Sequence, residues 1–109
     1  MELTVKERIL LADILPGSGD ISTIRISNDL RNSLGFTEEE HETYGFHSPE
    51  DNPNAILWNM EPPQERDIEM GKKAKELIVS ALKKLDEEGG VTVDHISLFD
   101  KFIGDGEDG

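Results

Sequence analysis

Apolar side chains recur at helical spacing through the first third of the chain. Thr4 and Glu7 have the spacing of a capping box, which predicts a first helix from Thr4 to about Leu15. The Pro-Gly-Ser-Gly segment at 16–19 ends this helix, because proline cannot continue it and glycine permits a tight reversal. A second helix is predicted to begin near residue 20 or 22. Four of its side chains share one face at helical spacing: Thr23, Ile26, Leu30 and Leu34.

The middle of the chain changes from helical to extended character. Thr37 and Glu40 form a second capping-box pattern, which predicts a short third helix through about Tyr44. Residues 45–54 contain prolines, asparagines and acids, as is typical of a loop. Ile56 to Met60 is the best strand candidate. We expect it to pair with Arg66 to Met70 as a β-hairpin, with residues 61–65 as the turn.

The C-terminal third predicts two more helices. The first starts at Gly71 and ends at Gly89-Gly90, and it has a wide apolar stripe made of Ala74, Leu77, Ile78, Ala81, Leu82 and Leu85. Thr92 is expected to cap the last helix, with an inward face made of Val93, Ile96, Phe99 and Phe102 or Ile103. The final residues, 104–109 (GDGEDG), cannot bury apolar surface, so we expect a disordered acidic tail.

These elements predict a mainly α protein with a small β-hairpin (α+β), folded as a single globular domain over residues 1–103. Three short helices followed by a two-stranded wing resemble the winged-helix family in the order of elements, with two further helices at the C-terminus. In that family the second and third helices form a helix-turn-helix. The resemblance implies that the third helix reads the DNA major groove and that the wing touches the backbone.

The charge distribution disfavours DNA binding by this region. Residues 32–65 contain no Lys or Arg, while they contain eight of the acids that give the net charge of −13: Glu38, Glu39, Glu40, Glu42, Glu50, Asp51, Glu61 and Glu65. Binding to DNA depends on cations that displace its counterions, so this surface would be repelled by nucleic acid and by anionic membrane. The acidic surface instead favours contact with a basic protein surface, and it could imitate nucleic acid toward a DNA-binding partner.

Composition excludes several other classes. Cysteine is absent, which excludes disulfides, a thiolate nucleophile and a Cys-based zinc site. The N-terminus begins with alternating charged and apolar residues, unlike a signal peptide. The longest apolar run, residues 9–12, is far too short to span a bilayer. We therefore expect a soluble, cytoplasmic protein.

Three stretches of the sequence carry a second resemblance. LTVKERILLADILP (3–16), LRNSLGFTEEEH (30–41) and ALKKLDEEGGVTVDHISLFDKFIG (81–104) resemble small uncharacterised proteins of tailed bacteriophages and prophages. The likeness covers nearly the whole chain except the loop at 45–55 and the tail. It implies a viral origin, and location in the host cytoplasm, but no activity and no functional residues.

No pattern in the chain favours catalysis. Glu38, His41, Glu42 and His47 could be imagined as a metal site, but their spacing matches no ligand motif and is typical of a solvated helix face. The Asp-Gly-Glu-Asp sequence at 105–108 stops short of the twelve residues of an EF-hand loop. Scattered serines lack a nucleophile elbow. We expect no enzyme activity, no metal and no cofactor.

The aromatic residues and the last helix leave alternatives open. Trp58, the only tryptophan, either seals a small core under the wing or anchors an interface. Tyr44 is either core or part of an aromatic rim beside the acidic helix. Leu98 lies off the main stripe of the last helix, so Leu98 and Phe102 are candidates for a homodimer contact; alternatively, a lean core takes every apolar residue available.

Two hypotheses of function follow. The first is a non-enzymatic phage accessory protein that binds a basic surface of a host or phage protein, with partner-binding residues Glu38, Glu39, Glu40, Glu42, Tyr44 and Trp58. The second is a structural or assembly protein that associates with itself through the last helix and Trp58. A small metal-dependent enzyme is the third and least favoured alternative.

Overall fold

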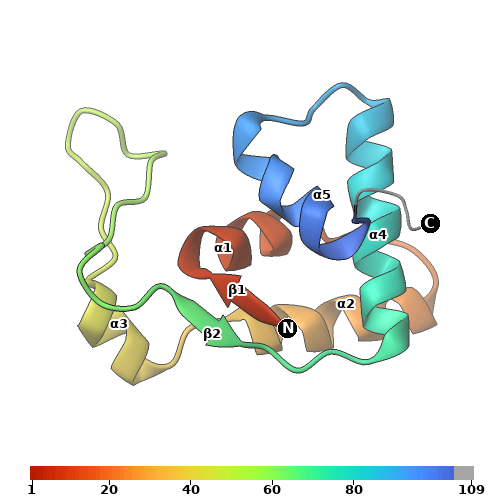
Figure 1. The fold of residues 1–109 in the computed structure, drawn as a ribbon, viewed down its shortest axis with the longest axis horizontal. Helices are drawn as coiled ribbons and strands as arrows, with labels where there is room; N and C mark the ends of the chain where they lie inside the picture. Colours follow the sequence, from red (N-terminus) through yellow and green to blue (C-terminus); the bar gives the residue numbers. More distant parts are fainter. Residues whose placement is uncertain (105–109) are drawn as a thin grey trace.

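The computed structural model describes residues 1–104 and is mainly helical, with one two-stranded antiparallel sheet, as the sequence predicts. Figure 1 shows the arrangement of the elements. In chain order these are β1 (Glu2–Thr4), α1 (Val5–Ile14), α2 (Ile21–Leu34), α3 (Glu38–Tyr44), β2 (Glu65–Asp67), α4 (Lys72–Glu87), the 3-10 turn η1 (Val93–His95) and α5 (Ile96–Phe102).

The capping residues behave as their local sequence predicts. The Thr4 hydroxyl accepts from the Glu7 amide, and the Glu7 carboxylate accepts from the Thr4 amide, so the first capping box is formed. The same exchange joins Thr37 and Glu40 at the start of α3. Gly45 ends α3 with φ of 57°, a left-handed conformation that favours glycine.

The sheet pairs different strands from those expected. β1 runs antiparallel to β2, with Leu3 opposite Arg66. The prediction that residues 56–60 pair with 66–70 is therefore wrong, although its second strand overlaps β2. Leu3 is completely buried, so the chain's first residues gain a core contact that the exposed segment 56–60 cannot offer. The winged-helix resemblance stays a prediction.

Residues 56–60 pair instead with the chain that leaves α3. Leu57 and His47 exchange two backbone hydrogen bonds of 2.7 and 2.9 Å, and the Asn59 amide donates to the Tyr44 carbonyl at 2.8 Å. These bonds close the loop between α3 and β2 on itself. The loop therefore needs no partner strand from the body of the protein.

The core lies where α1, α2, α4, α5 and the sheet meet, and nine buried side chains form it: Leu3, Leu11, Leu15, Leu30, Leu34, Ile68, Ile78, Leu82 and Leu98. In Figure 1, α1 lies near the centre, with α2 below it, α4 to its right and α5 above it. None of the residues from 35 to 67 belongs to this cluster. The middle of the chain is thus outside the main core.

The last helix faces the core partly as expected, since Phe99, Phe102 and Ile103 pack against the core. Leu98 is fully buried, whereas Val93 and Ile96, which we expected to face inward, are 81% and 53% exposed. Val93 lies in the 3-10 turn η1, which has three residues per turn and not the 3.6 on which the expected stripe was based, and Ile96 is the first residue of α5. The predicted disordered tail begins at Gly104, and its other residues, 105–109, lie outside the described part of the chain.

Candidate functional site

α3 and the loop that follows it form a projection at one end of the molecule. We call residues 38–64 the acidic lobe, since they contain seven acids and no Lys or Arg. Figure 1 shows the lobe in yellow and green, with its loop extending beyond the helical body. A surface that stands away from the body is accessible to a partner, so we take the acidic lobe as the candidate site.

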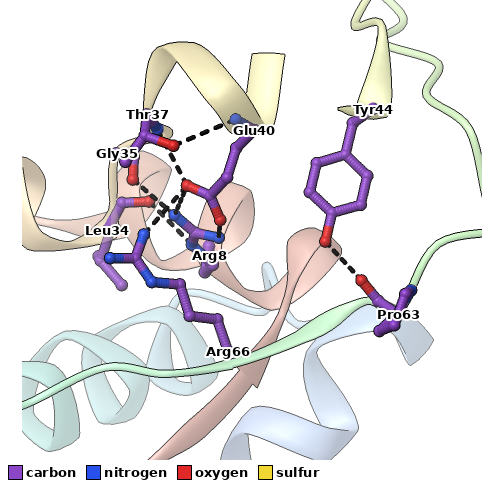
Figure 2. Close-up of polar contacts among 8 residues, drawn as sticks. All are labelled: Arg8, Leu34, Gly35, Thr37, Glu40, Tyr44, Pro63 and Arg66. Carbon is purple, nitrogen blue, oxygen red and sulfur yellow. Dashed lines mark hydrogen bonds and ion pairs between the residues drawn. The ribbon is translucent and has the colours of Figure 1, made fainter. Parts of the chain in front are cut away.

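One buried arginine attaches the lobe to the body. The Arg8 side chain in α1 is completely buried, and its guanidinium donates to both carboxylate oxygens of Glu40, at 2.8 and 3.1 Å. It also donates to the carbonyls of Leu34, at 3.1 Å, and Gly35, at 2.5 Å. Figure 2 shows these bonds converging where α2 ends and α3 begins.

A second arginine and an aromatic ring complete this attachment. Arg66 of β2 donates to Glu40 at 3.0 Å, and the Arg8 guanidinium lies 3.9 Å from the centre of the Phe36 ring. Cations attract aromatic faces through the ring quadrupole. We call Arg8, Glu40 and Arg66 the clamp. The clamp joins α1, α3 and β2, which are distant in sequence.

The clamp also fixes the charge of Glu40. Hydrogen bonds from Arg8 are the largest cause that lowers the pKa of Glu40 to about 2. Partial burial opposes this shift, and the Thr37 amide and the charges of Arg8 and Arg66 lower the pKa further. Glu40 is ionised at neutral pH and already neutralised by two cations. We predicted Glu40 as a partner-binding residue, and the structure shows it bonded inside the protein instead.

Tyr44, another predicted partner-binding residue, also makes its contacts inside the protein. It is buried, and its hydroxyl donates to the Pro63 carbonyl at 2.5 Å, which ties the end of α3 to the end of the loop (Figure 2). Its ring packs within a small aromatic cluster made of Phe36, His41, Tyr44, Phe46 and Trp58. Its burial therefore favours the prediction that Tyr44 is a core residue over the alternative that it belongs to an exposed aromatic rim.

Trp58 lies half-buried at the edge of the same cluster. Its ring centre is 6.1 Å from that of Phe46, and its indole N–H donates to the Gln64 side-chain oxygen at 2.8 Å. The Gln64 amide in turn donates to the carbonyls of Pro62, at 2.7 Å, and Asn59, at 3.3 Å. Trp58 thus seals a satellite core within the lobe and keeps part of its ring accessible.

The other acids of the lobe are exposed. None of them lies in an ion pair within residues 1–104, in contrast to Glu40; they are Glu38, Glu39, Glu42, Glu50, Asp51 and Glu61. Three large apolar side chains of the lobe are also exposed: Ile56 at 48%, Leu57 at 46% and Met60 at 65%. The lobe therefore combines unneutralised negative charge with accessible apolar surface.

The two residues predicted at an oligomer contact lie in the body. Leu98 is 0% exposed, so it is a core residue and cannot line a surface of the folded monomer. Phe102 is partly buried against the same core. Lys101, between them, donates to the buried Glu7 carboxylate at 2.7 Å and to the Glu2 carbonyl at 2.9 Å, which fixes α5 against the N-terminus.

The histidines of the lobe do not assemble with its acids. The His47 Nδ1 lies 2.9 Å from the Gly45 carbonyl oxygen. Across residues 1–104, no three His, Asp or Glu side chains come together in a way that could hold a metal ion. None of the helices in this part of the chain has both the length and the apolar character that crossing a membrane requires.

The chain matches no protein-family model, no curated protein and no solved structure. The candidate site therefore rests on its own geometry. Sequence reasoning missed Arg8, the residue that positions the site. Its position between Val5 and Leu11 on the apolar side of α1 was the available signal, since a charge there requires a buried partner.

Proposed function

We propose that this protein is a non-enzymatic accessory protein whose acidic lobe binds a basic surface on another protein. One observation carries the proposal: six exposed acids of the lobe have no ion-pair partner within residues 1–104, while the clamp neutralises the seventh and attaches the lobe to the body. Exposed charge of one sign steers an oppositely charged partner and increases the association rate.

The exposed apolar residues of the lobe support a protein partner. Ile56, Leu57 and Met60 lie in the same loop as Glu50, Asp51 and Glu61. Apolar area removed from water contributes affinity, whereas charges at the rim of an interface contribute mainly specificity and rate. A surface with both properties suits a partner that presents Lys or Arg around an apolar patch.

A nucleic-acid-binding protein is the partner class that fits best. The Lys and Arg residues of such a protein are already arranged to meet closely spaced anions, and the lobe would present carboxylates in place of phosphates. Direct binding to nucleic acid is disfavoured, because the lobe contains no cation. With the phage resemblance, the proposed partner is a host or phage protein in the bacterial cytoplasm.

The test is capture of partners on the immobilised protein and on a charge-reversed form. Glu38→Lys, Glu39→Lys and Glu42→Lys together reverse three exposed carboxylates of α3 and leave the clamp intact. A matched control reverses three exposed acids of the body, Asp13→Lys, Asp29→Lys and Asp100→Lys, with the same change in net charge. Circular dichroism checks that both variants are folded.

We expect a basic protein from bacterial lysate to bind wild type and the control but not the lobe variant, and to elute in high salt. Purified, that partner should lose about tenfold or more in affinity for the lobe variant. Equal binding to wild type and the lobe variant contradicts the proposal. Recovery of only the protein itself favours the self-associating alternative.

A further inference from the structure

The outward face of α4 carries the opposite charge to the lobe. Residues 72–84 contain five lysines and one acid. Side chains from this helix line a shallow groove of about 640 Å³. Val79 is the one apolar lining residue, and the others are Lys72, Lys75, Glu76, Ser80 and Lys83. This groove is not part of the lobe, and the proposed function does not use it.

The α4 lysines have no acidic partner within the described chain. The ion pairs of residues 1–104 use the N-terminal amine and four other cations, Lys6, Arg8, Arg66 and Lys101. The exposed acids of the lobe are equally unpaired. One molecule therefore presents two complementary surfaces, neither of which is satisfied internally.

The two surfaces cannot meet within one molecule. Figure 1, drawn with the longest axis horizontal, shows the lobe at one end and α4 at the other. That axis measures 39 Å, which is several times the reach of a side chain. Contact between the two surfaces requires a second molecule.

We propose that the lysine face of α4 binds the acidic lobe of a second copy of this chain. This inference rests on the proposed function, since it uses the same lobe and identifies one basic surface that the lobe fits. The contact joins different surfaces of the two copies, so it is compatible both with a head-to-tail chain of copies and with a two-fold pair in which each lobe meets the other copy's α4. A nucleic acid on α4 is the competing occupant, and binding of a duplex oligonucleotide tests it separately.

Charge reversal of both surfaces tests this pairing. The lobe variant is the one described above, with Lys at positions 38, 39 and 42. The helix variant combines Lys72→Glu, Lys75→Glu and Lys83→Glu, all on the exposed face of α4. Sedimentation velocity at about 0.1 M salt, where net repulsion is screened beyond about 10 Å, reports the oligomeric state.

We expect wild type to associate with increasing concentration and each variant alone to associate about tenfold or more weakly, because the reversed side chains, on α3 in one variant and on α4 in the other, then meet side chains of like charge. Mixing the two variants should restore association, since each surface of one variant then faces its complement on the other. A variant with both reversals should associate like wild type. The body control, Asp13, Asp29 and Asp100 to Lys, should behave as wild type.

Wild type that stays monomeric, or a mixture that fails to associate, overturns the inference. Binding of a duplex oligonucleotide by wild type, lost in the helix variant, also overturns it. The proposed function is tested by a different experiment: it fails if the lobe variant captures a basic partner as well as wild type does. Where both hold, the basic partner should dissociate the assembly of wild-type copies, because the two contacts use one lobe.

Discussion

Arg8 is a cation with no exposed surface, and its surroundings explain why the fold tolerates it. Its guanidinium has a carboxylate, two carbonyls and an aromatic face as partners. A buried charge is costly when it is unpaired, and removal of one partner of a buried pair typically costs about 3–5 kcal/mol. The clamp is therefore a feature on which attachment of the lobe depends.

Glu40→Gln should destabilise the protein by about 3 kcal/mol, because it leaves Arg8 buried without a compensating charge. Its neighbour Glu39 provides the matched control: Glu39→Gln alters an exposed, unpaired acid and should change stability by about 0.5 kcal/mol or less. Chemical denaturation gives both free energies of unfolding. Equal effects of the two substitutions would show that the clamp contributes nothing.

The stability difference between wild type and Glu40→Gln should depend on pH. The clamp lowers the pKa of Glu40 from 4.5 to about 2, so its contribution is complete above pH 4.5 and is lost as the pH falls through the folded pKa. The stability difference between wild type and Glu40→Gln should therefore shrink as the pH falls from about 4.5 to about 2. A difference that is constant over this range would contradict the low pKa of Glu40.

Capping at the residue scale could be predicted and the clamp could not. Thr37 and Glu40 are three residues apart, so their exchange of hydrogen bonds follows from the local sequence. Arg8 and Glu40 are 32 residues apart, and no local pattern pairs them. Glu40 therefore has two functions, in the cap and in the clamp, and the sequence indicated only the first.

At the scale of elements, amphipathic helices were predictable and strand pairing was not. The apolar stripe of α4 fixes its buried face, and Ile78 and Leu82 are indeed core residues. The choice between segment 56–60 and β1 as the partner of β2 depends on which segment reaches the core. That is a tertiary property, which a run of apolar residues such as 56–60 does not reveal.

The lobe should unfold before the helical body. Its residues are absent from the main core, and a satellite aromatic cluster with a few loop hydrogen bonds stabilises it instead. Regions with few buried apolar contacts open at lower free energy. Trp58, the only tryptophan, lies in the lobe, so its fluorescence reports on the lobe while far-ultraviolet circular dichroism reports mainly on the helices.

In urea we therefore expect the midpoint from Trp58 fluorescence to fall below the midpoint from circular dichroism. Tyr44→Phe removes the hydrogen bond to Pro63 and should reduce the free energy of unfolding of the lobe by about 1 kcal/mol. The fluorescence midpoint should therefore fall further, while the circular dichroism midpoint should change little. Coincident midpoints for wild type would show that the lobe and the body unfold as one unit.

At the scale of the whole molecule, charge is distributed unevenly along the longest axis. The lobe is acidic at one end, and the lysines of α4 lie at the other (Figure 1). The acidic block was evident from the sequence, because charge counts need no fold. The positions of the two surfaces at opposite ends required the structure, and this separation gives the molecule two distinct surfaces of opposite charge.

The net charge of −13 should make the thermal stability depend on salt. Acids that lack a partner repel one another in the folded state, so salt that screens this repulsion should stabilise the protein. Between about 0.01 and 0.15 M salt the screening length falls from about 30 to about 8 Å, and we expect the Tm of dilute protein to rise by several degrees. The lobe variant, whose three reversals reduce the charge from −13 to −7, should gain less. A Tm that falls with salt would mean that surface ion pairs outweigh the repulsion.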